Sequence, residues 1–292
     1  MDAQVVAFIV FTYGLSIALS LVIWLTGGHE SPFLFLSVFS MFIPASAVVA
    51  LRFTTGEKPH VDWVRPPRLY LPLALLLMPV TMHVVMLSAT VFLVGRIPWQ
   101  DWLTDHPTGV FHAPVQLGWG TLNTTGVAFH LILNAIFGLL VVSFLAFFEE
   151  IGWRAWLLQR LANTFSQRKA IVIVAVIWAA WHTPFVLSGI LYFANVSRGA
   201  AATILPIGEF GAGLVIGWLW IRTRNIWIVS LAHGALNNWG QYGFKFMKDV
   251  PVQAFGIEYR SYDAIALATG SVALTVLGGL LVYCCIPRFK NI

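Results

Sequence analysis

The chain has 292 residues, of which 59% are hydrophobic and 10% are charged, and its mean hydropathy is +0.81. Soluble globular domains carry about 25% charged residues, so this composition excludes an ordinary soluble protein. The formal net charge is +5. Basic loops that lie against anionic lipid account for this charge, so we expect a lipid bilayer and no nucleic acid as partner.

Long apolar runs recur along the whole sequence. A helix needs about 20 apolar residues to cross the hydrocarbon core of a bilayer. Eight runs meet this requirement, at residues 4–26, 32–51, 70–94, 127–148, 170–190, 200–221, 225–244 and 264–286. The sequence therefore predicts an all-α, polytopic transmembrane helix bundle of about eight spans. We interpret residues 1–292 as a single integral membrane domain.

The distribution of Lys and Arg predicts the orientation. Twelve of these residues fall on the face that follows the second, fourth, sixth and eighth spans, and five fall on the opposite face. Loops rich in Lys and Arg stay in the cytoplasm. We therefore expect both termini to be cytoplasmic.

Polar and ionisable residues within the apolar runs are few, and they are the informative ones. A charged side chain at the centre of a spanning helix costs about 2.5–3.5 kcal/mol on insertion scales, so such residues usually have a function. The candidates are Glu149, Glu150, His182, Glu209, His233 and Asn237.

The stretch 147–154, FFEEIGWR, closes the fourth apolar run with two acids. Glu150 and Arg154 are four residues apart, so they share a helix face and can form an ion pair. Glu149 is rotated by about 100° from Glu150 and can face the bundle interior. Partly desolvated there, Glu149 suits the role of a general base. The alternative is that both acids only mark the membrane boundary.

Two histidines strengthen the functional interpretation. His182 lies four residues after Trp178, and His233 lies four residues before Asn237, so each pair shares a helix face. A single histidine in a span usually packs and forms a hydrogen bond. Together with Glu149, however, these residues supply a base, a positioning group and an oxyanion donor for hydrolysis. Two imidazoles and one carboxylate could also hold zinc with an open position for water.

Three motifs follow one another on successive apolar segments. EExxxR is found at 149–154, FxxxH at 178–182 with Trp178 in place of Phe, and HxxxN at 233–237. In these motifs the sequence resembles the CPBP family of intramembrane proteases, which includes type II CAAX prenyl endopeptidases and bacterial Abi-type proteins. The resemblance covers about residues 127–244. We interpret the change from Phe to Trp178 as a matter of pocket shape rather than of chemistry.

The resemblance implies an intramembrane endopeptidase with the following roles. Glu149 activates a water molecule together with His182, and His233 and Asn237 stabilise the oxyanion. Glu150, Arg154 and Trp178 support the site. We favour a mechanism without a metal cofactor. If zinc is present, its ligands are expected to be Glu149, His182 and His233.

The resemblance also implies a peptide or protein substrate, either prenylated or a leader or pheromone peptide. We expect a multi-pass protein of a bacterial cell membrane whose active site opens to the cytoplasm. Two alternatives remain. One is a catalytically silent scaffold or bacteriocin-immunity protein of the same fold. The other is a proton-coupled transporter that uses Glu209, His182 and His233 as a relay.

Two further expectations concern geometry. At 1.5 Å per residue, His182 and Asn237 lie about 18 Å from the cytoplasmic end of their spans and His233 about 12 Å. Glu149, at the end of its span, is then too shallow to meet them unless the fourth span reaches less far or the site is a water-filled cytoplasmic funnel. The amphipathic segment 153–165 is expected to lie along the interface or to form a short re-entrant helix.

Overall fold

The computed structural model describes residues 2–56, 68–94, 110–112, 121–123, 132–191, 193, 196–246, 252–254, 257–259 and 263–287. The first half of the chain contains helices α1 (Ala3–Leu25), η1 (Gly28–Glu30), η2 (Leu34–Phe42), α2 (Ile43–Thr55) and α3 (Tyr70–Val94) and strands β1 (Val110–His112) and β2 (Thr121–Asn123). These two strands pair antiparallel.

The second half of the chain carries all three motifs. It contains helices η4 (Asn134–Gly138), α6 (Leu139–Glu150), η5 (Ile151–Leu158), α7 (Gln159–Thr164), α8 (Gln167–Trp181), α9 (Thr183–Ser188), α10 (Arg198–Thr223), α11 (Ile226–Phe246) and α12 (Asp263–Cys285). Strands β3 (Val252–Ala254) and β4 (Ile257–Tyr259) form a second short antiparallel pair before α12.

Apolar length confirms the predicted polytopic bundle. In the described part of the chain, seven helical stretches are long and apolar enough to cross a membrane: Ala3–Leu25, Leu34–Phe53, Tyr70–Phe92, Asn134–Thr164, Gln167–Ser188, Arg198–Thr223 and Ile265–Cys285. The predicted span 225–244 forms α11, which carries His233, Asn237, Asn238 and Lys245 and does not meet the same apolar criterion.

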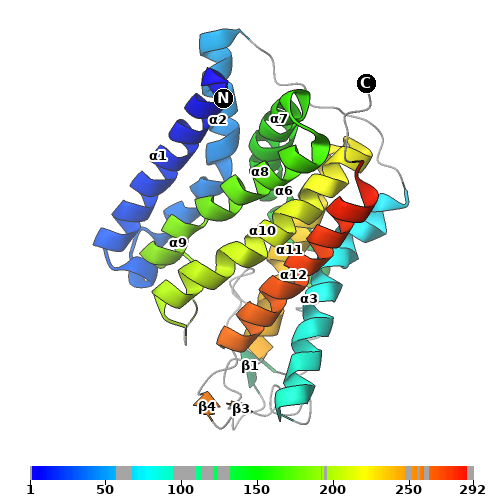
Figure 1. Cartoon of the computed structure of the whole chain (residues 1–292). Coiled ribbons are helices and arrows are strands. Elements are labelled where there is room, and N and C mark those ends of the chain that lie inside the picture. Colours follow the sequence, from blue (N-terminus) through cyan, green and yellow to red (C-terminus); the bar gives the residue numbers. More distant parts are fainter. Residues whose placement is uncertain are drawn as a thin grey trace.

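Helix α10 lies at the centre of the bundle. In its apolar window 61% of the residues are buried, against 28% in α1 and 28% in α3. Figure 1 shows α1 and α2 on one side of the molecule and α3 and α12 on the other, with α6–α11 between them. Four fully buried tryptophans fill this core, namely Trp153, Trp178, Trp181 and Trp220. Three of these tryptophans belong to the stretch that carries the first two motifs, so the motifs border this buried core.

The start of α1 and the end of α12 lie at the same end of the bundle. Arg160 of α7 donates a hydrogen bond to Asp2 at 2.8 Å, and Arg168 of α8 donates one to the backbone oxygen of Ile286. The hydrogen bond from Arg160 lowers the pKa of Asp2 below its usual value. Because both contacts come from the α7–α8 connection, this connection and the two ends of the helical region share one side.

The first half of the segment 153–165 is buried, which corrects the expectation that the whole segment lies along the interface. Residues 152–158 are buried, and the helix continues from α6 through η5 into α7. The only charge in η5 is that of Arg154, and this guanidinium is fully buried in an ion pair with Glu150. The exposed polar residues of the segment lie at its end in α7, where Asn163 and Thr164 are exposed.

The contact between α10 and α12 requires glycine at position 278. A Cβ atom added to Gly278 would lie 2.6 Å from the backbone oxygen of Gly211, whereas a Cβ on Gly279 would meet nothing within 4 Å. We predict that Gly278→Ala lowers the free energy of unfolding by about 1–3 kcal/mol, because the two backbones must separate. Gly279→Ala is the matched control and is expected to leave the free energy of unfolding unchanged. Reversible unfolding in mixed micelles measures the free energy of unfolding of both variants. Equal free energies for Gly278→Ala and Gly279→Ala would contradict the close packing of α10 and α12.

Candidate active site

The two acids of the first motif lie in a helix of changing pitch. Glu149 and Glu150 end α6 and are 4% and 0% exposed. The helix continues as the π-helix η5, and a second π-helical segment, η4, precedes α6. π-Helical segments are rare in proteins, and those that occur often lie at functional sites. Both carboxylates therefore lie inside the protein, within an unusual piece of backbone.

Glu150 is the centre of a buried ionic group. Arg154 Nη1 donates to Glu150 Oε1 at 2.8 Å, as the spacing of four residues predicts. His233 Nδ1 lies 2.8 Å from the same oxygen. Because a carboxylate only accepts hydrogen bonds, we assign the hydrogen of this contact to Nδ1 of His233. The first and third motifs therefore meet directly at Glu150.

Glu149 is held by the second motif. Trp178 Nε1 donates to Glu149 Oε2 at 3.2 Å, and both side chains are buried. The Arg154 guanidinium lies over the Trp178 ring, 4.6 Å from its centroid. The same ring packs against His233 in a T-shaped arrangement with a centroid distance of 5.2 Å. The interpretation of Trp178 as a matter of shape alone is therefore incomplete, because phenylalanine could not donate this bond.

His182 lies where α8 gives way to α9. Its Nδ1 is 2.9 Å from the backbone oxygen of Trp178, so Nδ1 carries the hydrogen and Nε2 remains able to accept. Glu209 Oε2 of α10 lies 4.0 Å from this Nε2. The two side chains are 12% and 19% exposed, so water can reach between them. Glu209, which is outside the three motifs, thus lies beside the site.

A glycine permits the close approach of α6 and α11. A Cβ atom added to Gly234 would collide with the Cα and Oγ of Ser143. Gly234 directly follows His233, and Ser143 lies two turns before Glu150. The small residue therefore allows α11 to come near enough to α6 for the contact between His233 and Glu150.

The asparagine of the third motif is exposed, unlike the histidine of that motif. Asn237 is exposed on α11, whereas its neighbour Asn238 is fully buried. Asn238 Nδ2 donates to the backbone oxygen of Asn134 in η4 at 3.4 Å. Sequence reasoning did not select Asn238. The available signal was the spacing from Gly234, because Asn238 follows it by four residues and so shares the face of α11 that approaches α6.

The expected depth of Glu149 is wrong. Residues 134–164 form one continuous candidate span, so the acids lie within it and not at its end. The sequence estimate ended the span at the first charges. Those charges are compensated, because Arg154 pairs with Glu150, and the helix can therefore continue through the bundle.

The described residues do not bring together three His, Cys, Asp or Glu side chains in an arrangement that could hold a metal ion. Glu149, His182 and His233 are instead engaged with Trp178, the backbone at 178 and Glu150. The side-chain geometry therefore does not fit a zinc site, and we derive no step through zinc.

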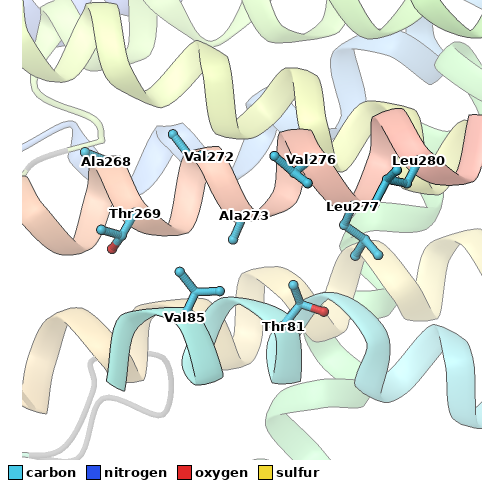
Figure 2. Close-up of a pocket in the computed structure, with 9 residues that line it drawn as sticks. All are labelled: Thr81, Val85, Ala268, Thr269, Val272, Ala273, Val276, Leu277 and Leu280. Carbon is cyan, nitrogen blue, oxygen red and sulfur yellow. The ribbon is translucent and has the colours of Figure 1, made fainter. Parts of the chain in front are cut away.

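A groove lies elsewhere on the bundle. Figure 2 shows it between α3, which contributes Thr81 and Val85, and α12, which contributes seven residues from Ala268 to Leu280. Its volume is about 620 Å³. The lining is almost entirely apolar and includes no acid, histidine or asparagine. This groove therefore offers no group that could take part in hydrolysis.

Comparison with known proteins agrees with the motifs. A family model described as type II CAAX prenyl endopeptidase Rce1-like matches residues 130–239. CAAX prenyl protease 2 of Methanococcus maripaludis is 24% identical over 140 residues, which make up 46% of this chain and 50% of that protein. The chain thus matches about half the length of this curated relative. Together with the three motifs, these matches support the similarity of residues 130–239 to the CPBP family of intramembrane proteases.

Proposed function

We propose that this protein is an intramembrane endopeptidase that hydrolyses a peptide bond in a membrane-associated or lipidated substrate. One observation carries the proposal. Glu149, a buried carboxylate, is held by Trp178 in the same group of side chains as His182, His233 and the Glu150–Arg154 pair. A base and two imidazoles within an apolar bundle are the groups that peptide hydrolysis requires.

Glu149 acts as the general base. A carboxylate offers about four lone-pair sites, so Glu149 can accept from Trp178 and from a water molecule at once. His182 Nε2 orients this water. Glu149 takes one proton as the water oxygen bonds to the scissile carbonyl carbon. The same proton then passes to the amide nitrogen as the C–N bond breaks, which leaves a carboxylic acid and an amine.

His233 stabilises the oxyanion. With its Nδ1 hydrogen directed to Glu150, His233 can donate from Nε2 only in its protonated form. Two carboxylates and one guanidinium are buried together here, so a protonated His233 balances the charge of the group. Its Nε2–H then faces the developing negative charge. Asn237, on the exposed side of α11, contributes its amide from the direction in which the substrate enters.

The substrate class follows from the resemblance. The curated relative is named CAAX prenyl protease 2. We therefore propose a prenylated C-terminal peptide as the first substrate class and a leader or pheromone peptide as the second.

A peptide panel tests the proposal. Purified protein in lipid nanodiscs is mixed with farnesylated CAAX peptides, the same peptides without the lipid, and leader peptides, and mass spectrometry identifies the products. We expect one internal cleavage in the lipidated class. If vesicles that contain the protein take up the peptides in a proton-coupled manner and cleave none of them, the result would instead support a transporter. The absence of both cleavage and uptake would favour a silent scaffold.

Orientation gives a separate prediction. We propose that the end of the bundle with Arg160, Arg168 and Lys169 is cytoplasmic, because basic residues gather there. Cys284 and Cys285 are exposed free thiols at the end of α12, on that same side. A membrane-impermeant maleimide is expected to label them in inverted membrane vesicles and not in intact spheroplasts. Labelling in spheroplasts would show the opposite orientation.

A further inference from the structure

Trp178 contacts three residues of the proposed mechanism, Glu149, His182 and His233. Its indole donates to Glu149, its backbone oxygen accepts from His182, and its ring forms a T-shaped contact with His233. It is fully buried in α8, next to the place where the chain turns into α9. A residue with these contacts can fix several groups relative to one another.

The bond to Glu149 is the contact with a chemical consequence. An indole N–H is a donor only, so the carboxylate oxygen that it meets must offer a lone pair. The bond therefore favours the form of Glu149 that can accept a proton from water. It also fixes one carboxylate oxygen and leaves the other free to meet the water. Phenylalanine, the usual residue of this motif, provides neither effect.

The ring itself has little freedom to move. The Arg154 guanidinium covers one part of it, and Arg154 is in turn tied to Glu150. On the α10 side, a Cβ atom added to Gly213 would lie 3.2 Å from the Trp178 ring, which shows how closely this helix approaches. The indole therefore presents its N–H to Glu149 from a fixed position, without an entropic cost during the reaction.

We propose that Trp178 is a positioning residue that sets the Glu149 carboxylate for hydrolysis. The proposal rests on the endopeptidase function described above. The role depends on the indole N–H of Trp178, since the shape of an aromatic ring alone would not orient the Glu149 carboxylate.

The first test separates the N–H from the ring. Trp178→Phe removes the donor and keeps an aromatic side chain, and 3-benzothienylalanine at 178 replaces only the N–H by sulfur. Trp181→Phe is the matched control. Trp181 is also fully buried in α8, but its Nε1 donates to Ser16 Oγ at 2.7 Å, away from Glu149.

Both changes at 178 are expected to lower kcat by about tenfold to a hundredfold and to leave KM within about twofold, because the bond supports a charge used in the reaction. Trp181→Phe is expected to keep kcat within about threefold. The proposal is overturned if Trp178→Phe keeps full kcat, or if the two phenylalanine variants lose kcat equally.

A second test does not require activity. The indole ¹H–¹⁵N resonance of Trp178 is assigned in nanodiscs as the signal that Trp178→Phe removes. Glu149→Gln is expected to shift this resonance, and Glu30→Gln, which changes an exposed acid, is not. An unshifted resonance overturns the proposal. If wild-type protein cleaves no peptide, the endopeptidase function fails, and the resonance still decides whether Trp178 holds Glu149.

Discussion

Replacing Glu149 with alanine is expected to lower kcat by about a hundredfold to ten-thousandfold, the range that general-base catalysis contributes. KM is expected to change little, because the residue acts on water and not on substrate binding. Steady-state kinetics with the best peptide of the panel provide the measurement. Alanine leaves the Trp178 N–H without its acceptor and removes one charge from the buried group, so the unfolding midpoint of the variant is measured beside its kinetics.

Two controls define this result. Glu149→Gln keeps the size and the hydrogen bond from Trp178 but cannot take a proton, so it should lose as much kcat as alanine. Glu30→Gln changes a largely exposed acid in η1 and should match the wild type. Undiminished cleavage by Glu149→Ala would show that another group activates the water.

Replacing Glu150 with alanine is expected to lower the free energy of unfolding by about 3–5 kcal/mol, the cost of leaving a buried charge without its partner. Arg154 is fully buried, and its ion pair would be lost. His233 would lose the acceptor of its Nδ1 hydrogen at the same time. Reversible unfolding in mixed micelles, followed by tryptophan fluorescence, provides the measurement.

A double substitution tests the physical reason. Glu150→Leu combined with Arg154→Met removes both charges and is expected to destabilise less than Glu150→Ala alone. Asp2→Asn breaks the exposed pair with Arg160 and should change stability little, because solvent screens such pairs. If Glu150→Ala unfolds at the wild-type midpoint, the buried pair does not stabilise the fold.

Apolar runs were sufficient to predict the helical bundle, because burial in lipid demands long uninterrupted helices. They did not predict where the fourth span ends. A sequence rule treats Glu149 and Glu150 as a boundary, whereas in the structure Arg154 compensates the charge and the helix continues to Thr164. Span ends at charged residues therefore depend on pairing, which a hydropathy sum does not contain.

Within the site, the contacts that follow from helical spacing were predictable and the long-range contacts were not. Glu150 and Arg154 are four residues apart, so their pairing follows from the pitch. The contacts from His233 to Glu150 and from Trp178 to Glu149 span 83 and 29 positions. They depend on how closely helices approach one another, as at Gly234, and no local pattern encodes that distance.

The measurement that tests the central claim most directly is cleavage of a farnesylated peptide by the full chain in nanodiscs, with and without a tight zinc chelator, beside Glu149→Gln. The proposed mechanism predicts the same rate with the chelator and loss of cleavage in the variant. Cleavage that stops with the chelator and returns with added zinc would contradict it and would indicate a metal held by Glu149, His182 and His233. Cleavage that survives in Glu149→Gln would contradict the role of Glu149 itself.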